Sequence, residues 1–487
     1  MRTPHCLDRR SFLKGSAAPL LGLVGRLLTN SGQACGESSF SNSFITRPGE
    51  SIFLLERSTL EDLWRVRRKV NPVIKSGRNP LIVRDREWEG SGPLIHGTVL
   101  YDPEDKLFKC WYQVFDLEAY RKKAAGSYRI CYATSTDGFR WDKPDLGLVE
   151  WRGSNKNNFV KLERIFTGAI DVQLVPPEAG IPHRFVALYL DQPGVCLSYS
   201  DDGVRWVEHK LNPVEASESD DHNILLYDRH RQIWMIYLRP RFHAGEWKRR
   251  RALIESKDLQ TWTKQEIVFF PDEGDPAEIM VMPVFQRGNL FFGLCDFYDR
   301  TRGSNEVELV FSADGWFWNR VPPREIFLPR GPAGDFDSGS IFLGSDPVIV
   351  GDEMRFYYGG FDMDHERYFP SVNTAIGVAT VRLDRLFGLV HSRPDAPGYI
   401  LTHPLLLNGS RLELNIEVEG QLRVAVADWN GTELPNYGFD DCAPVTGDSL
   451  RQSVSWHGRG LPSRAPEPLR LKFRLDGKAA LYAFTIA

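Results

Sequence analysis

The sequence has 487 residues, of which 42% are hydrophobic and 25% are charged, and its net charge at pH 7 is −4. These ordinary fractions exclude a disordered or fibrous chain. The mildly acidic charge argues against nucleic acid or an anionic membrane surface as the partner. A chain of this length can bury a large core, and it holds either two domains or one long repeat architecture.

Residues 1–34 have the pattern of an export signal, with a charged start, a short apolar run and small residues near the end. RRSFLK at residues 9–14 resembles the twin-arginine signal of bacteria, which exports proteins that are already folded. A Sec-type signal with an incidental arginine pair is the alternative. A lipid-modified Cys35 is a further alternative, although Gly32 stands where a lipoprotein signal usually carries Leu. We expect a periplasmic or extracellular protein.

The segment SIFLLERSTLEDLWRVRRKV at residues 51–70 is the only stretch with helical spacing. Its apolar residues Leu55, Leu60, Leu63 and Val66 recur at intervals of 3 to 5 residues. This spacing predicts an amphipathic helix that packs against the domain which follows.

A frame of Ser, Asp two residues later and Trp six residues later then occurs four times, at 135–141, 200–206, 256–262 and 312–318. The copies start 65, 56 and 56 residues apart, and each follows a short β-rich run. A period of this size predicts a β-propeller with one four-stranded sheet in each blade. The Asp can accept hydrogen bonds from the following amides, and the Trp can pack under neighbouring strands. We therefore interpret the repeat as structural.

A second recurrent element, two β-rich runs joined by a polar turn, lies upstream of each copy and predicts the first strands of a blade. It occurs five times, in the segments 97–113, 184–190, 223–240, 281–298 and 347–361. Asp384 and Phe387, after the fifth element, mark a degenerate fifth copy of the Asp frame. The sequence therefore predicts an all-β fold whose five-bladed β-propeller spans residues 50–395.

After Pro397 the pattern changes to short alternating runs separated by turn residues, which predicts a β-sandwich over residues 396–487. No later segment is apolar for long enough to span a bilayer. The cysteines beyond the leader are predicted to be buried thiols, since no paired Cys or Cys/His motif suggests zinc. They are Cys110, Cys131, Cys196, Cys295 and Cys442.

Propellers bind ligands at the end of the central channel where the innermost strand of each blade begins, so the polar residues just before those strands are the site candidates. In order of the five blades they are Glu89 and His96; Asp171; Asp220, Asp221 and His222; Asp275 and Glu278; and Asp335 and Asp337. Repulsion among converging acids raises some pKa values, which yields the protonated acid and ionised base that glycosidic bond cleavage needs. The alternative is that these loops are simply rich in acids.

Further side chains are candidates for substrate binding, together with His96 and His222. An arginine pair at the end of an inner strand could clamp an anionic sugar or hold a catalytic carboxylate, or form a structural ion pair. Aromatic residues and a histidine after the fifth element could support sugar rings, or pack as ordinary core residues. These candidates are Arg239 and Arg241, and Tyr357, Tyr358 and His365. The charged run 248–251 is interpreted as a solvated face or strand edge.

Several of these motifs together resemble exported five-bladed propeller proteins similar to glycoside hydrolase families 32 and 43. They are WEG before a first strand, GTVLYDPEDKLFKCWY, STDGFRWDKPDLGLVEW, GDFDSGS and YYGG, and GDSLRQSVSWHG resembles the sandwich behind such propellers. The resemblance covers most of residues 50–487. It implies a nucleophile or base on blade one, an auxiliary Asp on blade two and an acid on blade three, which by position are Glu89, Asp171 and Asp221.

The sequence also departs from those families. It has no WMNDPNG-like start, no RDP segment and no Glu-Cys acid motif, so fructan hydrolysis is not expected, and Glu278 on blade four takes the acid role. We therefore expect a glycoside hydrolase acting on a poly- or oligosaccharide, with Glu278 as proton donor and Glu89 or Asp221 as base or nucleophile. Asp337 and Asp171 would tune the site or bind sugar.

Two alternatives remain at this level. One is a carbohydrate-binding propeller without catalysis. The other is a phosphorolytic enzyme of the same fold, in which Arg239, Arg241 and His365 would bind the anion. We expect no cofactor and no metal; the acids leave calcium as an alternative ligand, although no contiguous calcium loop is visible. The sequence does not indicate an oligomeric state.

Overall fold

The computed structural model describes residues 43–487 except 123–126, 163–168, 192–193, 218, 241, 244–245, 365–371, 394 and 463–466. The predicted export signal and Cys35 lie outside the described residues. Strands dominate the rest, with one short helix, α1 (Leu117–Arg121), and two 3-10 turns, η1 (Glu87–Glu89) and η2 (Pro177–Ala179). The all-β prediction is confirmed. In the described part of the chain, no helix is long and apolar enough to cross a bilayer.

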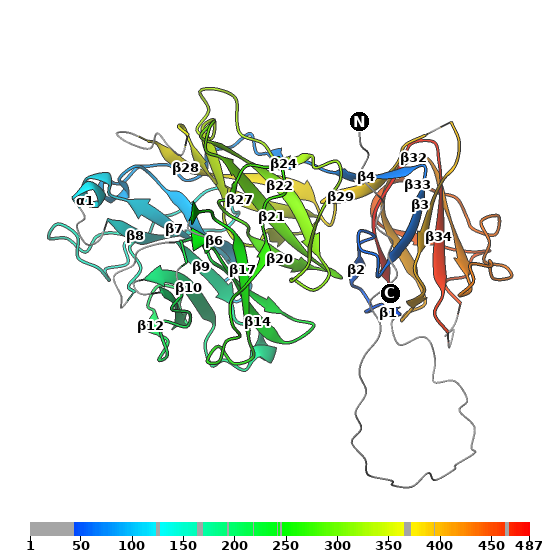
Figure 1. The fold of residues 1–487 in the computed structure, drawn as a ribbon, viewed down its shortest axis with the longest axis horizontal. Helices are drawn as coiled ribbons and strands as arrows, with labels where there is room; N and C mark the ends of the chain where they lie inside the picture. Colours follow the sequence, from blue (N-terminus) through cyan, green and yellow to red (C-terminus); the bar gives the residue numbers. More distant parts are fainter. Residues whose placement is uncertain are drawn as a thin grey trace, which may run out of the picture. The chain divides into compact units, whose positions relative to one another are not determined.

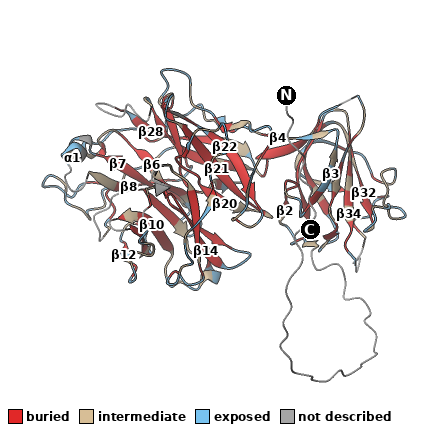
Figure 2. Ribbon diagram, in the orientation of Figure 1, coloured by how far each residue is buried: buried red, intermediate tan, exposed pale blue. Residues whose placement is uncertain are grey.

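Five antiparallel sheets follow one another along the described chain, which confirms the five-bladed propeller (Figure 1). Most of their strands are buried (Figure 2), as in β14 and β21. Blades one and two are β6 (Leu94–Asp102), β7 (Leu107–Phe115) and β8 (Tyr128–Ser135), then β9 (Ile170–Leu174), β10 (Phe185–Asp191), β11 (Gly194–Ser200) and β12 (Val207–Glu208). Blade three is β13 (Ile224–Asp228), β14 (Ile233–Leu238), β17 (Arg251–Ser256) and β18 (Glu266–Phe269).

Blades four and five each combine long strands with several short ones. Blade four is β19 (Glu278–Ile279), β20 (Val284–Arg287), β21 (Leu290–Asp299), β22 (Ser304–Ser312), β23 (Trp318–Arg320) and β24 (Ile326–Leu328). Blade five is β25 (Ser340–Leu343), β26 (Val348–Val350), β27 (Glu353–Phe361) and β28 (Thr374–Arg382). Its outer strand, β5 (Ile74–Lys75), comes from before blade one and pairs with β28. The first and last parts of the propeller chain therefore share one blade. A separate hairpin joins β15 (Phe242–His243) to β16 (Glu246–Trp247).

The repeated Asp frame has the structural role that the sequence predicts. In the first copy, Asp137 accepts hydrogen bonds from the amides of Phe139 and Arg140 at 2.7 and 2.8 Å, and Ser135 Oγ accepts one from the amide of Gly138 at 2.8 Å. The aspartates of the other copies, Asp202, Asp258 and Asp314, each accept the corresponding two amide hydrogen bonds. Because the carboxylate is tied into its own turn, it is not available for chemistry.

The glycine of this turn also joins neighbouring blades. Gly138 of blade one has φ +76°, and its carbonyl accepts a 2.9 Å hydrogen bond from the hydroxyl of Tyr357 on blade five. Trp111 of blade one donates to Gly203 of blade two at 2.6 Å, and Tyr237 of blade three donates to the equivalent carbonyl of blade four. Tyr357 is therefore a joint between blades. This burial and bonding contradict the sugar platform predicted for it.

Replacing Asp137 with Ala is expected to lower the free energy of unfolding by about 1–2 kcal/mol, because the turn loses the acceptor of two amide hydrogen bonds, as when a helix loses its capping residue. Denaturant unfolding of both proteins measures the difference. Asp145→Ala, an exposed aspartate in the loop that follows, is the control and should change stability by less than about 0.5 kcal/mol. Equal losses in the two variants would contradict the structural role of the frame.

The C-terminal strands form a nine-stranded sheet in the order β3-β30-β34-β32-β35-β29-β4, with β2 on β35 and β33 on β32. Its C-terminal strands are β29 (Phe387–His391), β30 (Gly398–Thr402), β32 (Leu412–Ala427), β33 (Val445–Val454), β34 (Arg470–Asp476) and β35 (Ala479–Ile486). Strand β32 pairs with β35 through residues 412–418 and with β34 through residues 421–427. At the change of partner, a Cβ on Gly420 would lie 2.0 Å from a backbone oxygen. One long strand thus serves two layers, consistent with the predicted sandwich.

The helix predicted over residues 51–70 is wrong. The segment forms β2 (Ser51–Ile52), β3 (Leu60–Trp64) and β4 (Val66–Val70), which pair with β35, β30 and β29. Arg65, between the last two, has φ +56°, which no right-handed helix can contain. The open edges of the C-terminal sheet override the local helical spacing. These residues, assigned from sequence to the propeller domain, pair with the C-terminal sheet, as does β29. A further short pair joins β1 (Phe44–Ile45) to β31 (Leu405–Leu406).

The cysteine prediction is confirmed for the described residues. Cys110, Cys131, Cys196, Cys295 and Cys442 are all buried, and none of these five forms a disulfide. Burial raises the pKa of the thiols of Cys110, Cys131, Cys295 and Cys442, so these groups behave as core residues rather than as nucleophiles.

Candidate functional site

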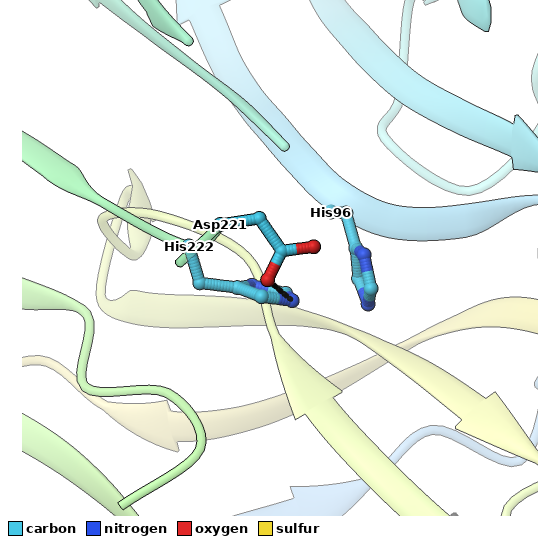
Figure 3. Close-up of side chains that lie close together, drawn as sticks. All are labelled: His96, Asp221 and His222. Atoms are coloured by element: carbon cyan, nitrogen blue, oxygen red, sulfur yellow. Dashed lines mark ion pairs between the residues drawn. The ribbon is translucent and has the colours of Figure 1, made fainter. Parts of the chain in front are cut away.

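Three of the predicted site residues come together where the inner strands of blades one and three begin. His96 lies on β6, and Asp221 and His222 immediately precede β13. Their potential ligand atoms lie within 4.8 Å of one another. The two imidazole rings meet edge to face with centroids 3.9 Å apart, and His222 Nε2 lies 4.0 Å from Asp221 Oδ1. Figure 3 shows the three side chains directed toward one another. We call them the His–Asp cluster.

Both histidines are placed by irregular backbone. The register of β6 against β7 shifts between Leu94 and Thr98, a stretch that contains His96. His222 has φ +62°, a left-handed conformation that is uncommon outside glycine. Bulges and strained dihedrals are frequent at functional sites because they re-aim a side chain. Here each irregularity occurs at the histidine that enters the cluster.

Aromatic rings enclose the cluster on the side of blade five. The ring of His222 stacks on Phe342 of β25 with centroids 5.8 Å apart, and His96 contacts Phe342 and Phe361 at 5.5 and 6.5 Å. Burial, with help from nearby positive charge, lowers the pKa of His222 well below its ordinary value. Its imidazole is therefore neutral near pH 7, with a lone pair that can bind a cation.

A chain of ion pairs runs from the cluster to blade four. Asp221 contacts Arg239, whose guanidinium also lies 3.0 Å from Asp220 Oδ2. Arg249 donates to the same Asp220 oxygen at 2.9 Å and contacts Glu278. The chain thus joins two of the predicted catalytic acids, Asp221 and Glu278, through two arginines. Buried charges of this kind are tolerated only because each is paired.

Glu278 is held in its ionised form. Burial would raise the pKa of this carboxyl, but Arg300, which donates at 2.8 Å, and Arg249 together lower it below its ordinary value. A proton donor needs a raised pKa. This environment argues against Glu278 as the proton donor and suits a residue that positions Arg249.

The interpretation of residues 248–251 as a solvated face or strand edge is wrong for Arg251, which begins β17 between β14 and β18. Arg251 is fully buried and donates to the carbonyls of His222 and Met280 at 3.2 and 2.8 Å. Burial lowers its pKa to about 9. Asp296 of β21 is also buried, and burial raises its pKa well above the ordinary value, with Asn305 donating to it at 2.7 Å. Arg249, Arg251 and Asp296 are the site residues that sequence reasoning missed.

Asp171 lies beside the cluster and links three blades. Its carboxylate accepts hydrogen bonds from Thr98 Oγ1 of β6 at 3.0 Å and from the amide of Leu225 of β13 at 2.7 Å. These partners are two and three residues from His96 and His222. Burial raises the pKa of Asp171 to about 6. The auxiliary role that the family resemblance implies for Asp171 stays a prediction.

The raised pKa of Asp171 predicts a pH-dependent stability. Because the folded protein binds this proton more tightly than the unfolded chain, the contribution is greatest below about pH 4 and is lost as the pH rises through about 6. The change is on the order of 2–3 kcal/mol. Asp171→Asn should remove it, so the wild type and variant should diverge in free energy of unfolding between pH 4 and 7. Parallel pH profiles, as expected for the exposed control Asp145→Asn, would contradict the raised pKa.

Glu89 does not join the cluster. It is fully buried, and its carboxylate accepts hydrogen bonds from the amides of Asp85 and Arg86 at 2.9 and 3.0 Å. Its other oxygen accepts hydrogen bonds from the hydroxyl of Tyr112 at 2.8 Å and from the ammonium of Lys143 at 2.6 Å. All these partners belong to the blade-one region. A carboxylate with four donors has little capacity left for a substrate, so the geometry argues against the predicted role as base or nucleophile.

Asp337 and Tyr358 pair with each other rather than with the cluster. Asp337 accepts from Lys75 of β5 at 2.6 Å and from the hydroxyl of Tyr358 at 2.8 Å, and Asn79 donates to that hydroxyl at 3.2 Å. These contacts fasten the N-terminal strand β5 to blade five. We therefore interpret the hydrogen bonds of Asp337 and Tyr358 as structural. Arg241 and His365 lie outside the described residues.

A separate cavity of about 430 Å³ lies at the other ends of the inner strands. Its lining includes Gln173, Tyr227, Arg229, Arg287 and Asp346. Among the residues that the structure describes, none of the site residues predicted from sequence lines it.

No protein-family profile matches the chain, and a search of curated proteins finds no match. Among solved structures, it is similar to an N-acetylgalactosamine deacetylase from F. plautii in complex with blood group B trisaccharide, at 14% identity and TM-score 0.42 over 66% of this chain and 96% of that chain. It is similar to a fructofuranosidase from Schwanniomyces occidentalis at 11% identity and TM-score 0.43, over 85% and 98% of the two chains. A β-1,2-mannobiose phosphorylase from Listeria innocua matches at 11% identity and TM-score 0.45, over 64% and 98%. Likeness at this level assigns neither a family nor an activity.

Proposed function

We propose that the protein is an exported carbohydrate-active hydrolase, with glycosidic bond cleavage as its reaction, and that the His–Asp cluster activates the attacking water. The observation that carries the proposal is the convergence of His96, Asp221 and His222 at the start of the inner strands. The resemblance of the sequence motifs to glycoside hydrolase families 32 and 43 supports a sugar as the substrate.

Shifted titrations around the cluster support catalysis over simple binding. Burial raises the pKa of Asp171 and Asp296 and lowers that of His222. Asp171 is hydrogen-bonded to residues close in sequence to His96 and His222, and Asp296 interacts electrostatically with Arg239 and Arg251. Such concentrations of perturbed groups are typical of catalytic sites. A lectin-like site would instead present exposed aromatic residues, yet Tyr357 and Tyr358 are buried, and their hydroxyls donate to Gly138 and to Asp337.

The roles within the site follow from the contacts. Glu89 and Asp337 are bound by structural partners, so Asp221 is the remaining predicted acid that faces the histidines. Arg239 is neutralised by Asp220 and Asp221. This pairing removes the support for a phosphate site at Arg239, and we do not favour phosphorolysis. Glu278 and Asp220 position the two arginines.

The test is a screen of the purified protein, without its leader, against plant and algal polysaccharides and aryl glycosides, with release of reducing sugar as the readout. Cleavage without added phosphate supports a hydrolase. Cleavage only with added phosphate would replace it with a phosphorylase. Binding of a polysaccharide without any cleavage would show a binding propeller and overturn the proposal.

A further inference from the structure

We propose that His96, His222 and Asp221 bind a divalent first-row transition metal ion. Two imidazoles and one carboxylate form a ligand set used by zinc, manganese and iron(II) in proteins. The inference concerns the same site as the proposed function, and it does not depend on which sugar is cut.

The geometry fits a metal after a small adjustment. Metal bonds of about 2.0–2.2 Å place two ligands of a tetrahedral ion about 3.3 Å apart. The ligand atoms here already lie within 4.8 Å of one another, and His222 Nε2 and Asp221 Oδ1 are 4.0 Å apart. Side-chain rotations that move these atoms by about 1 Å would complete the site. Three protein ligands leave positions open for water and substrate.

The surroundings of the ligands favour a preorganised site. The irregular backbone at both histidines costs conformational energy. Binding of a common ligand by the two side chains would offset this cost. The groups around the ligands also fix their orientation: Arg239 contacts the carboxylate of Asp221, Arg251 holds the carbonyl of His222, and Phe342 stacks on its ring. Partners of this kind orient metal ligands in known sites.

Two nitrogen ligands distinguish this site from a calcium site. Calcium prefers six to eight oxygen ligands, whereas imidazole suits zinc, copper, iron and nickel. The neighbouring arginines do not exclude a cation, because Arg239 and Arg249 are paired with carboxylates and Arg251 with carbonyl oxygens. A bound ion would supply a Lewis acid that lowers the pKa of its water, which is the activation that the proposed function requires.

Purified protein is first treated with a chelator and dialysed, and Co²⁺ is then titrated into it. Binding is followed by the visible absorption of the bound cobalt and by the heat of binding. We expect one Co²⁺ per chain with a Kd below about 10 µM. His96→Gln and His222→Gln should each weaken binding by about 100-fold or more. His96 is only half-buried in the wild type. His209→Gln replaces a buried histidine that hydrogen-bonds Tyr199 in blade two, and it should bind Co²⁺ as the wild type does.

Circular dichroism establishes that each variant is folded before the titration. Absence of Co²⁺ binding by the wild type, or unchanged binding in both His96→Gln and His222→Gln, would overturn the proposal. Competition by Ca²⁺ at similar concentrations would overturn the choice of a transition metal. The Co²⁺ titration contains no sugar, so it is independent of the carbohydrate screen. If the protein binds Co²⁺ but cleaves no carbohydrate, the metal site is supported and only the proposed hydrolase activity is rejected.

Discussion

Asp221→Asn is expected to lower kcat by about 10²–10⁴-fold on a sugar substrate found in the screen, with KM changed much less. An amide neither accepts a proton from water nor binds a cation as a carboxylate does, while its size and its contact with Arg239 are largely kept. Steady-state kinetics measure the effect, and circular dichroism checks the fold.

The neighbouring Asp220 provides a matched comparison. It lies one residue away on the same segment, but both arginines of the ion-pair chain bind its side chain. Asp220→Asn should therefore lower kcat by only about 10-fold through displaced arginines, because its Oδ2 is engaged by both Arg239 and Arg249. If Asp220→Asn abolishes turnover and Asp221→Asn retains it, the assignment of the reacting carboxylate is reversed.

Measuring Co²⁺ affinity on the same proteins separates two mechanisms. Joint loss of turnover and metal binding in Asp221→Asn identifies the carboxylate as a ligand. Loss of turnover with unchanged metal binding identifies it as a base and leaves the two histidines as the principal ligands. Glu278→Gln, by contrast, should retain part of the activity, since Glu278 is held ionised by Arg249 and Arg300.

The blade repeat could be predicted from sequence because its chemistry is local. Ser, Asp and Gly within four residues make their own turn, so each copy specifies the same backbone wherever it occurs. The third copy has Leu259 in the glycine position and still adopts φ +59°. The sequence pattern could not show that β5, which lies before blade one, completes blade five. A strand of two residues is too short to show an alternating hydrophobic pattern.

The site was predictable only in part. The rule that polar residues before inner strands form the site found His96, Asp221 and His222, but it also selected Glu89 and Asp337. Position before a strand does not say which way a side chain points, and the partners that decide it are distant: Lys143 is 54 residues from Glu89, and Lys75 is 262 residues from Asp337.

The missed arginines show the opposite error. A run of four basic residues normally faces water, since burying unpaired charge costs several kcal/mol. Here Arg249 pairs with Asp220 and Glu278, and Arg251 donates to backbone carbonyls. All these partners belong to other segments of the chain. Nothing within the run itself indicates these partners.

Glu89→Ala is expected to destabilise the protein by about 3–5 kcal/mol, because it removes one partner of a buried ion pair and leaves buried donors unsatisfied. Lys143 keeps the half-exposed Asp85 as its charged partner and the carbonyl of Val83 as an acceptor, and Tyr112 loses the acceptor of its hydroxyl. Denaturant unfolding measures the loss.

Glu87→Ala is the matched control, because Glu87 lies on the same 3-10 turn but is exposed. It should change the free energy of unfolding by less than about 0.5 kcal/mol. The comparison also tests the role that the family resemblance implies for Glu89. Catalytic groups are often held at a cost in stability, so their replacement tends to leave stability unchanged or higher while activity is lost. Such a result for Glu89→Ala would restore Glu89 as the base of blade one, whereas a large loss of stability assigns its carboxylate to the interior of the blade.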